Sequence, residues 1–250
     1  MAHLKRYAMP KDWHLPRKEK TFVVRPLPGM HTKNRCIPLQ IILRDILHYA
    51  ASAKEAKQIL SKGNVLVDKK VRKDPKFSAG LMDIIEIPEM NKIFRIVVSK
   101  KGLTLEKIQE NEAGKKLCRI QNKTTIKGGI TQLNLHDGRN ILLASPKGKK
   151  AQNLQRVSMH PATKKETQKQ DFMAGDSILI SLPDQKILKH YKLAKGSPAF
   201  IIGGRNIGAS GIIKDVHIKK NMLEKSTIML KTKEKEIETL KDYVIAGDLQ

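Results

Sequence analysis

The chain has 250 residues, and its 49 lysines and arginines outnumber its 24 acidic residues to give a formal net charge of +25. Positive charge in such excess repels itself unless a polyanion neutralises it, and a basic chain of this size is typical of nucleic-acid binding. Apolar residues make up 40% of the chain and aromatic residues only 4%, a balance that favours several small cores over one large enzyme core.

The sequence carries no sign of membrane insertion, secretion or metal binding. Its apolar runs are shorter than the roughly 18–20 residues of a membrane-spanning helix, and its N-terminus lacks the apolar core of a signal peptide. Cys36 and Cys118 stand far apart without a C-x-x-C pair, which is typical of two reduced thiols rather than a zinc site. We therefore expect a cytoplasmic protein that binds no membrane, no structural metal and no cofactor.

Residues 1–36 form a first segment that is rich in proline and basic residues and has no sustained apolar period. Such a segment cannot offset its chain entropy alone, so we expect an extended arm, disordered in isolation, that threads into folded RNA. A tail without a specific partner is the alternative. We expect Trp13 to be exposed and to stack on a base or pack at a junction of RNA and protein. The RNA-binding candidates of the arm are Lys5, Arg6, Lys11, Trp13, Arg17, Lys18, Lys20, Arg25, Lys33 and Arg35.

Residues 37–92 show a different pattern, with two predicted helices followed by a hairpin. Apolar residues recur at helical spacing through IPLQIILRDILHYA, where Pro38 suits a first helical turn. A second helix is predicted from Ala53 to Leu60, with Gly63 in the turn that ends it. Strands are predicted at VLVD and at LMDIIEI, which ends at Pro88, with a turn at DKK after the first.

Residues 93–172 are predicted to form a β-rich, strongly basic central domain. Strand signals occur in FRIVVSK, KLCRIQNKTTIKGG and TQLNLHDGRNILL, with a hairpin turn at Asp137-Gly138. The polar stretch SPKGKKAQNLQRVSMHPATKKETQKQ is predicted to be a mobile loop or an arm that faces RNA. The RNA-binding candidates of this domain are Arg139, Lys147, Lys149 and Lys150.

Residues 173–250 are predicted to form a small SH3-like barrel. Short strand signals recur in GDSILISLPD, KILKHYKL, PAFIIGG, SGIIKDVHI and STIMLKT, separated by turn residues. The intervening GGRNIGAS has the two outer glycines of a phosphate-binding loop, but Ala209 stands where that loop has its lysine. A phosphate-binding loop also leads into a helix, whereas the branched residues that follow here predict a strand. We therefore expect no nucleotide site at this turn.

The order of two helices, a Gly-x-Val-x-Val-Asp strand and a hairpin resembles the small RNA-binding domain named from the fourth bacterial small-subunit ribosomal protein. The resemblance implies that the helix pair and the following turn present cations to RNA. The residues that match are Arg44, Lys54, Lys57, Lys62, Lys69, Lys70 and Arg72. A solvated surface charge is the alternative for a single lysine of this set, and it is weaker for the cluster as a whole.

Gly204, Gly208 and Gly211 follow the G-x-x-x-G-x-x-G spacing of the KOW motif, which occurs in ribosomal proteins and transcription elongation factors. Glycines at these positions allow the chain to turn sharply with positive φ. Arg205 and Asn206 at the tip of the turn are the expected contact residues. A purely structural hairpin explains the pattern equally well, and contact with RNA or with protein stays open.

The chain as a whole resembles small-subunit ribosomal protein four of the archaeal and eukaryotic type, through HLKRYAMPKDW, PGMHTKNRCIPL, MDIIEI and QLNLHDGRN. Met30 and Ser78 stand where that family commonly has proline. The resemblance implies a multidomain α+β fold and a structural, non-catalytic role bound to ribosomal RNA of the small subunit, beside neighbouring ribosomal proteins.

Two other functions remain as alternatives. The helix-pair domain also occurs in RNA-modifying enzymes, for which Asp137 in HDGRN would be the candidate catalytic carboxylate. A transcription or translation factor that uses the KOW turn for protein contact is the second alternative.

Overall fold

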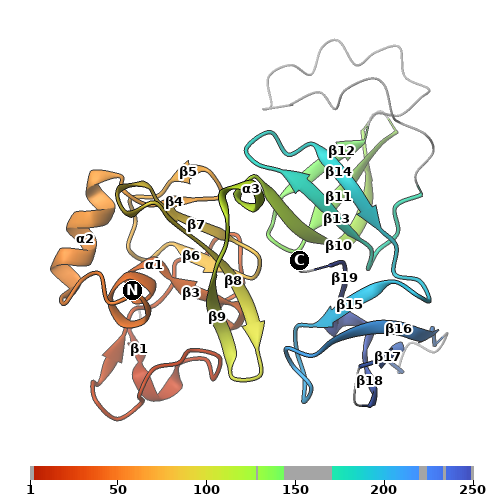
Figure 1. The fold of residues 1–250 in the computed structure, drawn as a ribbon, viewed down its shortest axis with the longest axis horizontal. Coiled ribbons are helices and arrows are strands. Elements are labelled where there is room, and N and C mark those ends of the chain that lie inside the picture. Colours follow the sequence, from red (N-terminus) through yellow and green to blue (C-terminus); the bar gives the residue numbers. More distant parts are fainter. Residues whose placement is uncertain (1–2, 128, 144–170, 220–223, 233–234, 249–250) are drawn as a thin grey trace. The chain divides into compact units, whose positions relative to one another are not determined.

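A computed structural model describes residues 3–127, 129–143, 171–219, 224–232 and 235–248. The chain separates into two compact units, Met1–Lys116 and Leu117–Gln250, and each is described by itself. Most elements are short strands, with few helices (Figure 1). This mixed architecture agrees with the predicted α+β class.

The N-terminal segment of the first unit is folded rather than extended. Strand β1 (Leu4–Lys5) pairs antiparallel with β2 (Phe22–Val23), and single 3-10 turns form at Arg6–Ala8 and Lys33–Arg35. Three apolar side chains of the segment are buried in the core of the unit, those of Leu4, Met9 and Trp13. The segment therefore contributes to the first hydrophobic core.

The predicted exposure of Trp13 is wrong. Only 3% of this residue is accessible, and its indole N–H donates a 2.7 Å hydrogen bond to the carbonyl oxygen of Cys36. A buried indole whose N–H finds an acceptor is stable in a core. Trp13 is thus an anchor of the segment and is not available to stack on a base.

The two predicted helices are present. β3 (Cys36–Pro38) pairs with β6 (Ser78–Gly80) and leads into α1 (Leu39–Ile41). The helix then widens into a π-helical turn at Ile42–Ile46, where the N–H of Leu47 donates to Ile42 five residues back. Helix α2 (Ala53–Lys62) begins with a capping box between Ser52 and Glu55 and ends at Gly63, whose φ is +85°. Gly63 accommodates the left-handed cap without the cost of a Cβ.

A sheet with the strand order β5-β4-β7-β8-β9 completes the first unit (Figure 1). Its strands are β4 (Leu66–Val67), β5 (Lys70–Val71), β7 (Ile84–Ile87), β8 (Lys92–Ser99) and β9 (Gly102–Lys107). The turn between β4 and β5 has positive φ at Asp68 and Lys69, as a two-residue hairpin of the primed type requires. Single turns follow at Pro88–Met90 and in α3 (Glu110–Ala113). The predicted strands at VLVD and MDIIEI are confirmed.

The second unit contains a sheet with the order β12-β11-β10-β13-β14. The strands are β10 (Lys115–Ile126, which begins at the boundary between the units), β11 (Ile130–Leu135), β12 (Asn140–Leu143), β13 (Ser177–Ser181) and β14 (Ile187–Tyr191). Its core is built around Cys118, Ile120, Leu133, Ile178 and Ile180. Strands form at the predicted KLCRIQNKTTI and TQLNL, but the predicted strand FRIVVSK belongs to the sheet of the first unit. The polar stretch at 145–170 lies outside the described residues.

A further sheet of this unit has the order β18-β17-β16-β15-β19. Its strands are β15 (Pro198–Ile201), β16 (Ser210–His217), β17 (Thr227–Lys231), β18 (Glu236–Leu240) and β19 (Val244–Ala246), with a 3-10 turn at Lys241–Tyr243. The predicted grouping of the strands from 177 onward is therefore wrong, because β13 and β14 pair with the preceding sheet. Short alternating strands look alike in sequence, and their pairing depends on distant partners.

Among the residues that the structure describes, no helix is long and apolar enough to span a membrane.

Candidate nucleic-acid interface

Helix α2 separates its cations from its apolar side. Ala56 and Leu60 are buried in the core, while Lys54, Lys57 and Lys62 are exposed. Lys62 lies in the last turn, where a positive charge is favoured by the helix dipole. The spacing of the apolar residues thus directs three ammonium groups to solvent.

The β4–β5 hairpin adds further cations next to the end of this helix. A Cβ placed on Gly63 would lie 3.3 Å from Val71 Cγ1 and 3.9 Å from Lys73 Cε, so the end of α2 and β5 are adjacent. Lys70 is exposed, whereas Lys69 forms a 2.9 Å ion pair with Glu86. We call Lys54, Lys57, Lys62 and Lys70 the helix–hairpin cluster.

Two arginines that match the RNA-binding resemblance are partly engaged within the protein. Arg44 forms a 2.7 Å ion pair with the neighbouring Asp45. The guanidinium carbon of Arg72 lies 4.5 Å from the ring centroid of Phe77, in a cation–π arrangement. Both side chains are half-buried, so they are less available to phosphates than the exposed lysines.

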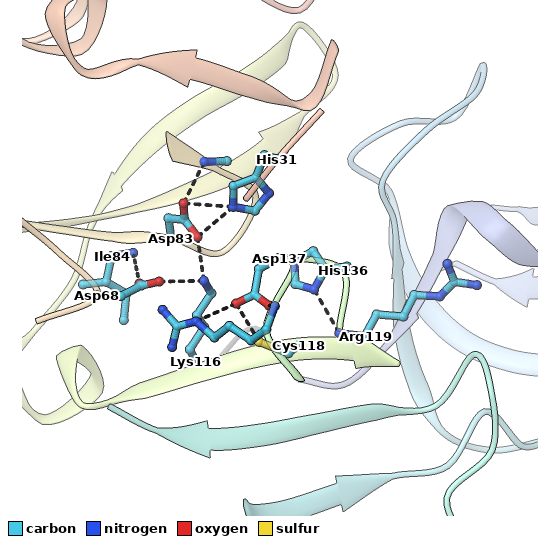
Figure 2. Close-up of polar contacts among 11 residues, drawn as sticks. His31, Asp68, Asp83, Ile84, Lys116, Cys118, Arg119, His136 and Asp137 are labelled. Carbon is cyan, nitrogen blue, oxygen red and sulfur yellow. Dashed lines mark hydrogen bonds and ion pairs between the residues drawn. The ribbon is translucent and has the colours of Figure 1, made fainter. Parts of the chain in front are cut away.

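A buried network of charges holds the hairpin from within the first unit (Figure 2). Lys116 Nζ lies 2.7 Å from Asp68 Oδ2 and 2.6 Å from Asp83 Oδ1. His31 Nε2 lies 3.0 Å from Asp83 Oδ2, and the N–H groups of Gly80 and Ile84 donate to the carboxylates of Asp83 and Asp68, respectively. The network therefore joins the N-terminal segment, the hairpin turn and two strands.

Electrostatics keeps Asp83 ionised in this network. Burial alone raises the pKa of the Asp83 carboxyl, but Lys116 and His31 outweigh it and hold that pKa well below its usual range. The carboxylate of Asp68, at a residue with positive φ, is tied to the same ammonium group. The arrangement fixes the backbone of the turn that contains Lys69 and is followed by Lys70.

Sequence reasoning missed this network, although one signal was present. Asp83 interrupts an apolar run in LMDIIEI, and Lys116 precedes another in KLCRI. A charged residue in a run that is otherwise buried requires a partner. The sequence alone does not say which distant residue supplies it.

The cations of the N-terminal segment divide into exposed and structural groups. Arg6 is only 3% accessible and lies 3.5 Å from Glu19, so it is less available to RNA than the exposed cations, and its RNA contact stays a prediction. The guanidinium of Arg17 donates to the carbonyl oxygens of Tyr7 at 2.9 Å and Met9 at 3.4 Å. The exposed members are Lys5, Lys11, Lys18, Lys20, Arg25, Lys33 and Arg35.

The HDGRN turn of the second unit has a structural role. Asp137 is completely buried and lies 3.1 Å from Arg139 Nε, and its carboxylate also accepts from Cys118 Sγ at 3.6 Å. The N–H of Arg119 donates to His136 Nδ1 at 3.1 Å (Figure 2). A carboxylate enclosed in this way fixes its hairpin and is not poised to act on a substrate. Arg139 is correspondingly half-buried.

The glycine turn joins β15 to β16, so a strand follows it, as predicted. Gly204 and Gly208 have φ of +86° and +79°, and a Cβ on Gly211 would lie 2.5 Å from the carbonyl oxygen of Lys231. Arg205 is exposed and Asn206 half-buried. Lys147, Lys149 and Lys150 lie outside the described residues.

Comparison with family models gives three matches. Residues 90–187 match the ribosomal family S4e, residues 2–34 match the RS4NT domain, and residues 37–85 match the S4 domain. The S4 match covers both helices and the β4–β5 hairpin.

The relatives agree with these matches. The chain is 42% identical to small ribosomal subunit protein eS4 of Methanocaldococcus jannaschii over 98% of its own length and 94% of the relative's. It is 42% identical to the eS4 protein of Methanococcus maripaludis, over 97% of this chain and 92% of that one. The crystal structure of the 30S ribosomal protein S4e from Thermoplasma acidophilum matches with a TM-score of 0.66 and 27% identity, covering 86% of this chain and 95% of that chain. The chain therefore belongs to the ribosomal protein family S4e.

Proposed function

We propose that this protein is a structural component of the small ribosomal subunit that binds its ribosomal RNA in the cytoplasm. The observation that carries the proposal is the 42% identity to proteins named small ribosomal subunit protein eS4, over nearly the full length of both chains. The net charge of +25 suits the same role, because each phosphate that a lysine or arginine neutralises releases counterions. The protein acts as a constituent of the subunit and not as an enzyme.

The helix–hairpin cluster is the main RNA contact that we assign within the first unit. Its four lysines are exposed. Three stand on α2, whose first turn is fixed by a capping box, and Lys70 follows the hairpin turn that the buried ion network holds. Ammonium groups held in this way contact phosphates and recognise the shape of folded RNA rather than its sequence. Lys69, Arg44 and Arg72 act as supporting members, since each already has a partner within the protein.

The exposed cations of the N-terminal segment provide a second contact. They are borne by a folded segment, so their positions are set before RNA arrives and less ordering entropy is lost on binding. Arg139 and the lysines at 147, 149 and 150 belong to the RNA-binding set of the second unit.

The sheet from β15 to β19 is proposed to be an SH3-like KOW domain. The supporting observations are the positive φ of Gly204 and Gly208 and the close backbone approach at Gly211. Arg205 and Asn206 stand at the tip of the turn, where they contact RNA or a neighbouring ribosomal protein. No nucleotide cofactor or membrane is assigned a role.

Sedimentation of a cell lysate through a sucrose gradient tests the proposal. A tagged copy of the chain is expected to co-sediment with small subunits in one-to-one stoichiometry at moderate salt. Recovery at the top of the gradient would contradict the proposal. A substoichiometric association that is lost on washing would favour a translation or transcription factor instead.

A further inference from the structure

The N-terminal ribbon formed by β1 and β2, and the turn that follows β1, expose aromatic side chains that do not pack in the core. Phe22 is 55% accessible and Tyr7 is 80% accessible, in a chain with few aromatic residues. Leaving rings of this size in water forgoes the favourable burial of their apolar surface. Their exposure therefore calls for an explanation.

The pairing of the strands decides which side chains face outward. Leu4 is opposite Val23, and Lys5 is opposite Phe22. Side chains directly opposite in an antiparallel pair lie on the same face, and successive residues alternate between faces. Leu4 is buried, and Val23 packs against the same core. Lys5 and Phe22 consequently share the outward face.

This outward face combines a ring with positive charge. The His3 ring centroid lies 5.5 Å from that of Phe22, with the planes tilted by 51°, and the ammonium of Lys5 stands on the same face. Lys18 and Lys20 are exposed in the residues that lead into β2. The nearby carboxylate of Glu19 is paired with the buried Arg6, so positive charge dominates around the ring.

The platform is also held rigidly. The inner face of the ribbon is packed on the core, and the N–H of Arg6 extends the pairing by donating to the carbonyl oxygen of Thr21 at 2.9 Å. Arg17 braces the next turn through the carbonyl oxygens of Tyr7 and Met9. A backbone fixed in this way loses little conformational entropy when a ligand stacks on the ring that it carries.

We propose that the outward face of the β1–β2 ribbon is a stacking site for an unpaired RNA base, with Phe22 as the platform and Lys5 beside it as the phosphate contact. An unpaired base offers a flat π-face to the ring and a phosphate to the ammonium, and this complementarity favours single-stranded RNA over an apolar protein surface. Tyr7, in the turn that follows β1, is a second exposed ring of the segment. The inference rests on the proposed RNA-binding function and assigns to Phe22 the stacking role that the buried Trp13 cannot fill.

Fluorescence of the full-length Phe22→Trp variant tests the site directly. The native indole at position 13 is buried, so quenching by a ligand reports on the introduced ring. We expect quenching by a ten-nucleotide single-stranded RNA of mixed sequence, and none by an abasic strand of equal length. Equal quenching by both strands, or quenching by neither while the RNA still binds, would overturn the stacking site.

Affinities of two further variants separate stacking from charge. Phe22→Leu is expected to weaken binding of the same RNA about fivefold or more, as the loss of one base stack does, and to leave the salt dependence unchanged. Leu188→Ala, which removes an apolar side chain of similar exposure (51%) in the second unit, is the control and should bind as the unaltered protein does. Unchanged affinity in Phe22→Leu would refute the stacking site, whereas a complete lack of RNA binding by the unaltered protein would instead contradict the proposed function.

Discussion

Two basic regions of the first unit are held in place in different ways. The N-terminal segment is held largely by contacts between residues far apart in the sequence, among them Trp13 with Cys36, His31 with Asp83, and the carbonyl oxygen of Asp12 with the N–H of Leu103. The α2 helix and the β4–β5 hairpin are shaped by adjacent residues, through the capping box at Ser52, the glycine cap at position 63 and the positive-φ turn at 68–69. The distant Lys116 adds a further hold on this turn through Asp68. Both regions present cations, but only the structure of the second region can be predicted from its local sequence.

The largest effect that tests this comparison concerns the buried ammonium group. Lys116→Met removes the ammonium group that pairs with the carboxylates of Asp68 and Asp83. Breaking a buried ion pair costs about 3–5 kcal/mol. We expect the free energy of unfolding of the first unit to fall by about that amount, as measured by urea denaturation. Lys115→Met removes the exposed neighbouring charge and should change stability by no more than about 0.5 kcal/mol. Equal effects of the two variants would show that the network does not hold the unit together.

A large effect is also expected from shortening the side chain of Trp13, the anchor of the N-terminal segment. Trp13→Ala removes a large buried side chain and its hydrogen bond, a change that costs about 3–5 kcal/mol in a packed core. We expect a loss of this size by circular dichroism, together with faster hydrogen exchange at the Leu103 amide, which donates to Asp12. A floppy tail would instead leave the stability within about 0.5 kcal/mol of the unaltered protein.

Acid should weaken the same network. Because the pKa of Asp83 is held below its usual range by Lys116 and His31, its ionised form stabilises the fold at any pH above the ordinary aspartate value of about 3.9. This contribution is lost as the pH falls below that value, because Asp83 then takes up a proton in the unfolded state but stays ionised in the folded state. Urea unfolding from pH 6 to pH 3 is expected to show a smaller pH dependence in Asp83→Asn than in the unaltered protein. An identical pH dependence would rule out the assigned charge state.

The local signals of the second region predict smaller effects. Ser52→Ala removes the side chain that accepts from the N–H of Glu55 at 3.2 Å, and the loss of such a cap costs about 1 kcal/mol. Ser52→Asp preserves the acceptor and is the matched control, with a stability expected close to that of the unaltered protein. A loss in Ser52→Ala as large as that in Trp13→Ala would remove the distinction between the two regions.

The sequence predicts those parts of the fold whose structure is determined by residues close to them in the chain. The two helices follow from the apolar spacing and from Gly63, and the end of β7 follows from Pro88. The packing of Trp13, the pairing of β13 and β14 with β10 to β12, and the π-helical turn after α1 depend on contacts that no local pattern specifies.

The site is predictable to a similar extent. Exposure of Lys54, Lys57 and Lys62 follows from their positions off the apolar side of α2, and that of Lys70 from its place directly after the hairpin turn. The contact of all four with RNA stays a prediction. Burial of Arg6 and Asp137 does not follow from the sequence, because a charged side chain looks solvated until the partner that permits its burial is known. The outward orientation of Phe22 does not follow from the local sequence, because it depends on the register between β1 and β2.

The salt dependence of binding to a transcript of small-subunit ribosomal RNA tests the central claim most directly. The slope of log K against log salt concentration is negative, and each neutralised phosphate contributes about 0.7–0.9 to its magnitude. Replacement of the four lysines of the helix–hairpin cluster by glutamine should therefore reduce this magnitude by about 3. The control replaces four other exposed lysines of the first unit, Lys100, Lys101, Lys107 and Lys115. We predict a reduced slope for the cluster variant and a nearly unchanged slope for the control. An unchanged slope for the cluster variant, or the same reduction in both, would contradict the assignment of this cluster as the RNA-binding surface.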